Sequence, residues 1–215
     1  MKPSKRKSKI KIGVVGENSM NDSEALITLL RKKAFENIDF QFITKKLKGS
    51  GLDGVKFFKL LEDEMVRFDK IIFIRDADGV LDEQILAKKH IRDEWFRKAD
   101  KAIGGKGIFF LAIAEMEALI LADINAFNTF YGTKQQFQGN PMMVEKPKET
   151  LKNWSDKSKK GKYHETHAPD IFEKLDFETV YKNHKGERSF QTFADELKAH
   201  EVINFEFTDK RIVKK

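Results

Sequence analysis

Four short apolar segments alternate with helical segments over the first 132 residues of this 215-residue chain. The apolar segments are residues 10–17, 39–47, 69–79 and 106–115. Segments 21–35, 55–68 and 81–99, which lie between them, carry apolar residues at helical spacing. Buried strands that alternate with amphipathic helices form parallel sheets covered by helices on both faces. The sequence therefore predicts an α/β domain over residues 10–132, with a mostly parallel sheet flanked by helices.

The character of the sequence changes after residue 132. Residues 133–162 are rich in lysine and poor in strand signals, and residues 168–181 and 188–200 have the spacing of short helices. Residues 201–213 are compatible with a final strand. We expect residues 133–215 to form a small, basic, mainly helical C-terminal appendage.

The charge balance favours an anionic partner. The chain has 41 lysine and arginine residues against 34 acidic residues, a formal net charge of +7. Residues 1–9 form a basic tail, which we expect to be a flexible terminus; an arm that grips phosphates is the alternative. This balance favours nucleic acid as the partner.

Several classes of protein are excluded or disfavoured. The chain has no cysteine, which rules out disulfides, thiolate zinc sites and cysteine nucleophiles. Its longest apolar run, residues 107–122, contains two glutamates and is too short to span a bilayer comfortably. The N-terminus is basic but is not followed by a secretory signal pattern. We expect a soluble, cytoplasmic protein without a membrane partner.

Acidic side chains follow three of the four predicted strands. Glu17 follows the first, Asp76 and Asp78 end the third in "IIFIRDADG", and Glu115 and Glu117 follow the fourth. The carboxyl ends of parallel strands meet at one edge of a sheet, where functional groups collect. We therefore expect these carboxylates to converge at that edge.

Carboxylates that converge repel one another unless a cation lies between them. A set of oxygen ligands without histidine or cysteine suits Mg²⁺ or Mn²⁺. We expect Asp76 and Asp78 to bind the metal, with Glu17 as a further ligand or general base. One of Glu115 and Glu117 completes the shell, and we take Glu117 as the candidate ligand. Taken singly, each stretch favours an ordinary turn or a helix-capping loop; the metal interpretation rests on acids after three of the four strands.

The most concentrated basic segment outside the tail contains Lys146, Lys148, Lys152, Lys157, Lys159, Lys160 and Lys162. Lys148 lies beside a proline that limits its backbone motion, and we expect it to neutralise a scissile phosphate. Trp154 and Tyr163 lie among these lysines, either as platforms for unpaired bases or within a solvated loop around a buried tryptophan. His164 and His167 lack the ligand spacing of a zinc site, which favours a surface or supporting role.

The chain resembles the Toprim domain, and in particular the small stand-alone proteins like the OLD-family nucleases. The resemblance rests on an acid after the first strand, D-x-D after the third, and four segments of similar sequence. These segments are "VVGENSMNDSEALITLL", "IAEMEALILADINAF", "NPMMVEKPKETL" and "RSFQTFADEL". Asn18 stands where the family has glycine, and the first loop is longer than usual.

The resemblance implies metal-dependent hydrolysis of phosphodiester bonds in DNA or RNA, often within antiviral defence systems beside an ABC-type ATPase. The chain has no G-x-x-x-x-G-K-[ST] motif, so a partner would supply ATP hydrolysis. A catalytically silent Toprim-like subunit for nucleic-acid binding or assembly is one alternative. A D-x-D metal-dependent nucleotidyl or glycosyl transferase is another. A phospho-acceptor receiver domain fits less well, because it requires paired acids after the first strand.

Overall fold

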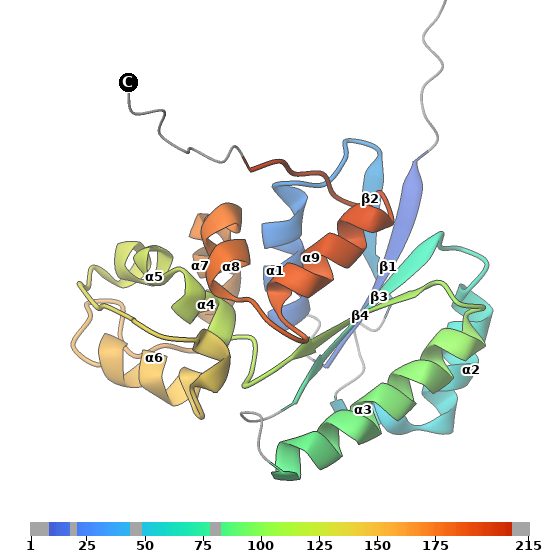
Figure 1. Ribbon diagram of the computed structural model, residues 1–215, viewed down its shortest axis with the longest axis horizontal. Coiled ribbons are helices and arrows are strands. Elements are labelled where there is room, and N and C mark those ends of the chain that lie inside the picture. The colour runs from blue at the N-terminus through green and yellow to red at the C-terminus, as the bar shows by residue number, and fades with distance from the viewer. Residues whose placement is uncertain (1–8, 18–20, 44–48, 78–82, 208–215) are drawn as a thin grey trace, which may run out of the picture.

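A four-stranded sheet forms the centre of the computed structural model, which describes residues 9–17, 21–43, 49–77 and 83–207. The strands are β1 (Ile10–Gly16), β2 (Ile38–Phe42), β3 (Lys70–Asp76) and β4 (Gly107–Ala112). They are hydrogen-bonded in the order β2-β1-β3-β4, and every pair is parallel. Helices cover both faces, so the predicted α/β fold is confirmed (Figure 1).

One face of the sheet is covered by two long helices and a short 3-10 turn. These are the 3-10 turn η1 (Gly49–Asp53), α2 (Val55–Glu64) and α3 (Glu83–Ala102). Figure 1 shows α2 and α3 together below the sheet. Phe73 of β3 and Phe109 of β4 point into this layer, where both lie against Trp95 of α3. Alternate strand residues thus bury their side chains on this face.

The other face is covered by α1 and α9, and further helices from the second half of the chain pack beside these two. Their bounds are α1 (Asp22–Arg31), α4 (Ala118–Ala122), α5 (Ile124–Tyr131), η2 (Pro141–Met143), α6 (Pro147–Ser155), η3 (Glu165–His167), α7 (Ala168–Lys174), α8 (Phe177–Asn183) and α9 (Phe190–Ala199). Phe110 of β4 packs on Phe193 of α9 with ring centroids 4.8 Å apart. None of the helices in the described part of the chain is long and apolar enough to cross a membrane.

The hydrophobic core of this second face contains residues from both sides of the predicted domain boundary at residue 132. It joins strand residues such as Ile72 to Phe172 of α7 and Leu197 of α9. Lys32, just after α1, donates hydrogen bonds to the carbonyls of Glu173 (2.6 Å) and Leu175 (2.5 Å) at the end of α7. Residues 133–207 are thus mainly helical, as predicted, and their helices pack on the α/β domain. The boundary at residue 132 stays a prediction.

The expectation of a final strand is wrong over its described part, residues 201–207. Ile203 forms one isolated antiparallel bridge with Ala34, and the segment has no strand. Val202, Ile203 and Phe205 are buried. The apolar residues that suggested a strand therefore fill the core beside α1 and do not extend the sheet.

Candidate active site

The carboxyl ends of β1, β3 and β4 lie side by side, so most of the predicted site residues share one edge of the sheet. Gly16 pairs with Ile74, and Asp76 pairs with Ala112. Glu17 thus follows β1 beside Arg75, and residues 113–117 follow β4 beyond Asp76. Asp78 lies outside the described residues.

Neighbouring residues at the end of β3 point to opposite faces of the sheet. Ile72 and Ile74 pack in the core that contains α1, whereas Phe73 and Ala77 pack in the core that contains α3. By this alternation Arg75 faces α3, and Asp76 faces the α1 side. Asp76 is partly buried, with its Oδ1 atom inaccessible to solvent.

Arg75 is the centre of an ion cluster on the α3 face. Its side chain is only 1% exposed. The guanidinium Nε donates to Glu17 Oε1, and Nη1 donates to Asp53 Oδ1 at 3.1 Å. Its plane lies over the Trp95 ring, 4.6 Å from the centroid. Arg92 of α3 adds a second cation, 3.5 Å from Glu17.

This Arg75 cluster gives Glu17 a structural role in addition to its predicted one. A buried guanidinium requires carboxylate partners, because an unpaired charge in a protein interior is very costly. The sequence reasoning missed Asp53 and Arg92, although an arginine inside an otherwise apolar strand signals that such partners exist. Metal ligation by Glu17 stays a prediction, and Glu17 would have to weaken its contact with Arg75 to do it.

A second ion cluster lies on the other side of the edge, around Lys148 at the start of α6. Glu117 follows β4 and is only 4% exposed. Its Oε1 accepts a hydrogen bond from the Tyr163 hydroxyl at 3.1 Å and lies 3.9 Å from Lys148 Nζ. Lys148 Nζ also donates to Glu165 Oε1 at 2.8 Å. The structure therefore brings Lys148 to the predicted acids, across about 30 residues of sequence. It adds Tyr163, which the sequence marked for another role, and Glu165, which no local signal marked.

The backbone between β4 and α4 is strained. Ala114 has φ = 65° and Glu115 has φ = 95°, a region that residues other than glycine rarely adopt. Glu115 Oε2 accepts a hydrogen bond from the backbone amide of Lys148 at 3.3 Å. Strained residues of this kind cluster at functional sites, where the surrounding structure holds them in place.

The electrostatics of the Lys148 cluster follow from burial. Burial raises the pKa of Glu117, and the nearby Lys148 ammonium opposes this shift. For Lys148, burial acts to lower the pKa, but the carboxylates of Glu117 and Glu165 outweigh it and raise the pKa. Lys148 therefore keeps its positive charge at neutral pH.

The donor chemistry of this edge fits a hard divalent cation, since Asp76, Glu115 and Glu117 offer only carboxylate oxygens. Within residues 9–17, 21–43, 49–77 and 83–207, no three acidic or histidine side chains form a group that could hold a metal ion. Asp78 lies beyond these ranges, so the complete predicted ligand set is not described.

The other sequence-selected residues fall outside the two clusters or change role. Tyr163 is 2% exposed and binds Glu117, so it is not a platform for bases. Trp154 is partly exposed. His167 Nδ1 lies 2.7 Å from the Tyr131 hydroxyl, and His164 caps the short turn η3. The two histidines therefore have surface or supporting contacts, as expected.

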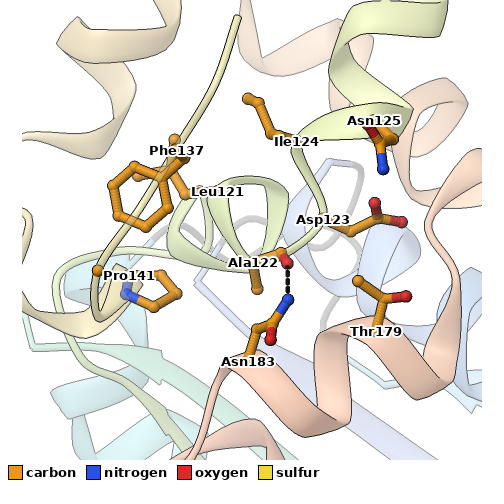
Figure 2. Close-up of a pocket in the computed structure, with 10 residues that line it drawn as sticks. Leu121, Ala122, Asp123, Ile124, Asn125, Phe137, Pro141, Thr179 and Asn183 are labelled. Atoms are coloured by element: carbon orange, nitrogen blue, oxygen red, sulfur yellow. Dashed lines mark hydrogen bonds between the residues drawn. The ribbon is translucent and has the colours of Figure 1, made fainter.

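A small polar pocket of about 240 Å³ lies at the far end of α4 (Figure 2). Asn183 of α8 reaches into it and donates to the Ala122 carbonyl at 2.9 Å. Asp123 also lines it; burial raises the pKa of this carboxyl, and its Oδ2 accepts from the Asp176 amide at 2.8 Å. The ten lining residues include no lysine or arginine, so this pocket does not suit a phosphate group.

Comparisons with protein-family models, with curated proteins and with solved structures find no match to this chain.

Proposed function

We propose that the protein is a metal-dependent nuclease that hydrolyses phosphodiester bonds of DNA or RNA with Mg²⁺ or Mn²⁺. The main supporting observation is the Lys148 cluster. A protonated lysine and two glutamates lie together at the edge of a parallel sheet on which Asp76 also ends. Such edges are where α/β proteins bind their ligands.

Different side chains would bind the phosphate, hold the metal and act as general base. Lys148 is placed to hold the charge of the scissile phosphate next to the carboxylates, since it stays protonated and its partner Glu165 is partly open to solvent. Tyr163 holds the Glu117 carboxylate in place through its hydroxyl. Asp76, Asp78 and Glu117 would hold the metal, and Glu115, anchored on the Lys148 amide, would act as general base. A bound divalent ion would supply Lewis-acid stabilisation of the charge that develops on the phosphate.

Partners follow from charge and from the family resemblance. The net charge of +7 suits nucleic acid as the substrate. The Toprim resemblance adds the proposal of an antiviral defence system in which an ABC-type ATPase is the partner.

A second candidate function is supported by the Arg75 cluster. Glu17 is held by two arginines, which suits a structural carboxylate better than a metal ligand. A catalytically silent nucleic-acid-binding or assembly subunit would retain the basic surface and would not need the metal.

A cleavage assay tests the proposal directly. The purified protein is incubated with plasmid, single-stranded DNA and tRNA in Mg²⁺, in Mn²⁺ or in EDTA, beside the Asp76→Asn/Asp78→Asn variant. Asp63→Asn, an exposed position on α2, is the matched control for the loss of an acid. We expect metal-dependent cutting by the wild type and the control, and none by the double variant. Equal cutting by all three proteins, or no cutting and no Mn²⁺ binding in calorimetry, would overturn the nuclease proposal.

A further inference from the structure

A basic pocket of about 680 Å³ opens between the end of α6 and the segment that follows α5. Among its lining residues are Trp154, Gln135, Lys134, Lys157 and Lys159. We propose that this pocket binds an unpaired nucleotide of single-stranded DNA or RNA, with the base on Trp154 and the backbone phosphates at the lysines. The inference rests on the proposed function and deepens it by naming the substrate class.

Trp154 has the position that a stacking platform needs. It is partly exposed in the pocket, while its ring packs edge-on against the buried Phe127, with centroids 6.4 Å apart at an interplanar angle of 63°. The core thus contacts the indole, while part of the side chain stays exposed and lines the pocket. Stacking on an aromatic side chain is how proteins bind unpaired bases of any sequence.

The walls of the pocket are fixed by hydrogen bonds to side chains. Asn128 of α5 accepts from the Gln135 amide and donates to the Gln135 carbonyl, both at 2.8 Å. It also accepts from the Thr133 hydroxyl at 2.8 Å. On the opposite wall, the Ser158 hydroxyl donates to the Tyr131 carbonyl at 2.7 Å. A pocket that is already formed binds more tightly, because less ordering is required on association.

The charges of the pocket suit a phosphate backbone. Lys134, Lys157 and Lys159 are exposed, and none of them forms an ion pair within the described part of the chain. The acid at the rim, Asp156, is paired with Lys162 at 3.0 Å. The pocket therefore presents net positive charge, in contrast to the pocket of Figure 2, whose lining has no lysine or arginine.

The helix α6 connects this pocket to the candidate active site. Lys148 lies in its first turn and Trp154 in its last, six residues further on, a rise of about 9 Å along the axis. The same six residues turn the helix so that the two side chains lie about 120° apart around its axis, and a flexible strand would follow the surface of α6 from Trp154 to Lys148. This arrangement favours substrates with single-stranded segments over continuous duplex.

Tryptophan fluorescence tests binding without relying on cleavage. The chain has two tryptophans, and Trp95 is only 5% exposed, so quenching by a ligand reports on Trp154. The probes are oligothymidylate and oligouridylate of about 12 nucleotides, within the range of single-strand sites, and a duplex of the same length. All titrations contain EDTA and use the full chain. We expect both single strands to quench the fluorescence and the duplex to bind more weakly. Tighter binding of oligothymidylate would indicate DNA as the substrate, and tighter binding of oligouridylate would indicate RNA.

Two kinds of variant measure the roles of ring and charge. Their affinities are measured by fluorescence anisotropy of a dye-labelled oligonucleotide, because the Trp154 variants lack the tryptophan that reports binding. Trp154→Leu should weaken binding of the single strand roughly 5- to 150-fold, the loss of one stacked base. Trp154→Phe keeps a ring against Phe127 and should lose less. Binding weakens as salt rises, so the slope of the logarithm of the association constant against log salt is negative. The triple variant Lys134→Gln/Lys157→Gln/Lys159→Gln should reduce the magnitude of this slope by up to about 2. The matched control Lys56→Gln/Lys59→Gln/Lys101→Gln removes the same charge from exposed sites on α2 and α3, and should leave the slope near that of the wild type.

The outcomes separate this inference from the proposed function. Equal affinity of wild type and both Trp154 variants, or tighter binding of the duplex, would overturn the pocket proposal even if the protein cuts nucleic acid. Trp154-dependent binding with neither cleavage nor bound Mn²⁺ would support the pocket and overturn the nuclease.

Discussion

Arg75 and Lys148 are the cations of two ion clusters that lie on opposite sides of the same sheet edge. Arg75 is fully buried, lies over Trp95 and contacts two acids on the α3 face. Lys148 is partly exposed and lies between Glu117 and Glu165, beside a strained backbone. In the Arg75 cluster the cation is buried and its acids reach water; in the Lys148 cluster the acid Glu117 is buried and the cation reaches water.

This inversion assigns different roles to similar residues. Arginine keeps its charge at all relevant pH values and offers a planar fork of donors, so a buried arginine fixes the positions of its acids. A buried carboxylate beside a solvent-accessible lysine is instead poised to meet a charged ligand. We infer that the Arg75 cluster holds Glu17 and the turn η1 in place, while the Lys148 cluster is the one that suits the proposed chemistry.

The largest effect on stability is expected when both acidic partners of Arg75 are replaced. Glu17→Ala/Asp53→Ala would leave a buried guanidinium beside Arg92 without an anion, at a cost of about 3–5 kcal/mol in the free energy of unfolding. Urea denaturation measures this loss. The matched control Glu17→Gln/Asp53→Asn/Arg75→Met also removes the buried guanidinium and should cost far less, because the cation that remains, Arg92, reaches solvent. A loss below about 1 kcal/mol in the first variant would show that the acids do not hold Arg75.

For Lys148 we expect the main loss to be in activity. Lys148→Gln removes the charge that faces the phosphate, and kcat for cleavage should fall roughly 10²- to 10³-fold. Lys152→Gln, one turn further along α6 and paired with Glu149, is the control and should retain activity. Wild-type kcat in Lys148→Gln would remove the main support for chemistry at this cluster.

The two clusters also show which features of the fold and of the candidate site could be predicted from the sequence, and which could not. Alternating apolar segments determine the sheet and both helical layers, because burial of each face follows from local periodicity. The carboxylates after β1, β3 and β4 could be assigned to one edge for the same reason. Their partners could not, since Asp53 and Arg92 reach Arg75 only through the packing of η1 and α3, and Glu165 reaches Lys148 through a turn that has no periodic signal. Local sequence predicts which side chains reach the edge, and tertiary packing decides what they contact.

The second layer of helices also contains a buried histidine, His184, just after α8. Burial lowers the pKa of His184 to about 4, and its Nδ1 accepts a hydrogen bond from the Phe190 amide at 2.9 Å. A depressed pKa gives stability that is present above the unfolded value of 6.5 and is lost as pH falls toward 4. This loss should reach about 3 kcal/mol, from a shift between 6.5 and about 4 at 1.36 kcal/mol per unit.

Urea unfolding at pH 7 and at pH 4.5 measures the effect of His184. In His184→Asn the amide oxygen can replace Nδ1 as acceptor but does not titrate, so the variant should lose less stability on acidification than the wild type. His90→Asn, at an exposed position of α3, should leave the pH dependence unchanged. Identical pH dependence in wild type and His184→Asn would contradict a buried neutral histidine.

The smallest expected effect is a change of stability on removing the charge of Glu117. It is also the most direct test of the reversed burial of cation and acid in the two clusters. Burial raises the pKa of Glu117, so the folded chain binds this proton more tightly than the unfolded chain does. A raised pKa means that stability is present at low pH and is lost as pH rises, and the ionised Glu117 therefore costs stability at pH 7. Glu117→Gln keeps an acceptor for Tyr163 and should unfold at higher urea in EDTA, by on the order of 1 kcal/mol at pH 7. The gain should shrink toward pH 4.5.

Removing acids from the Arg75 cluster would then destabilise the protein, and removing one from the Lys148 cluster would stabilise it. A destabilised Glu117→Gln at pH 7 would instead mean that attraction to Lys148 outweighs burial, and that the two clusters hold the fold in the same way.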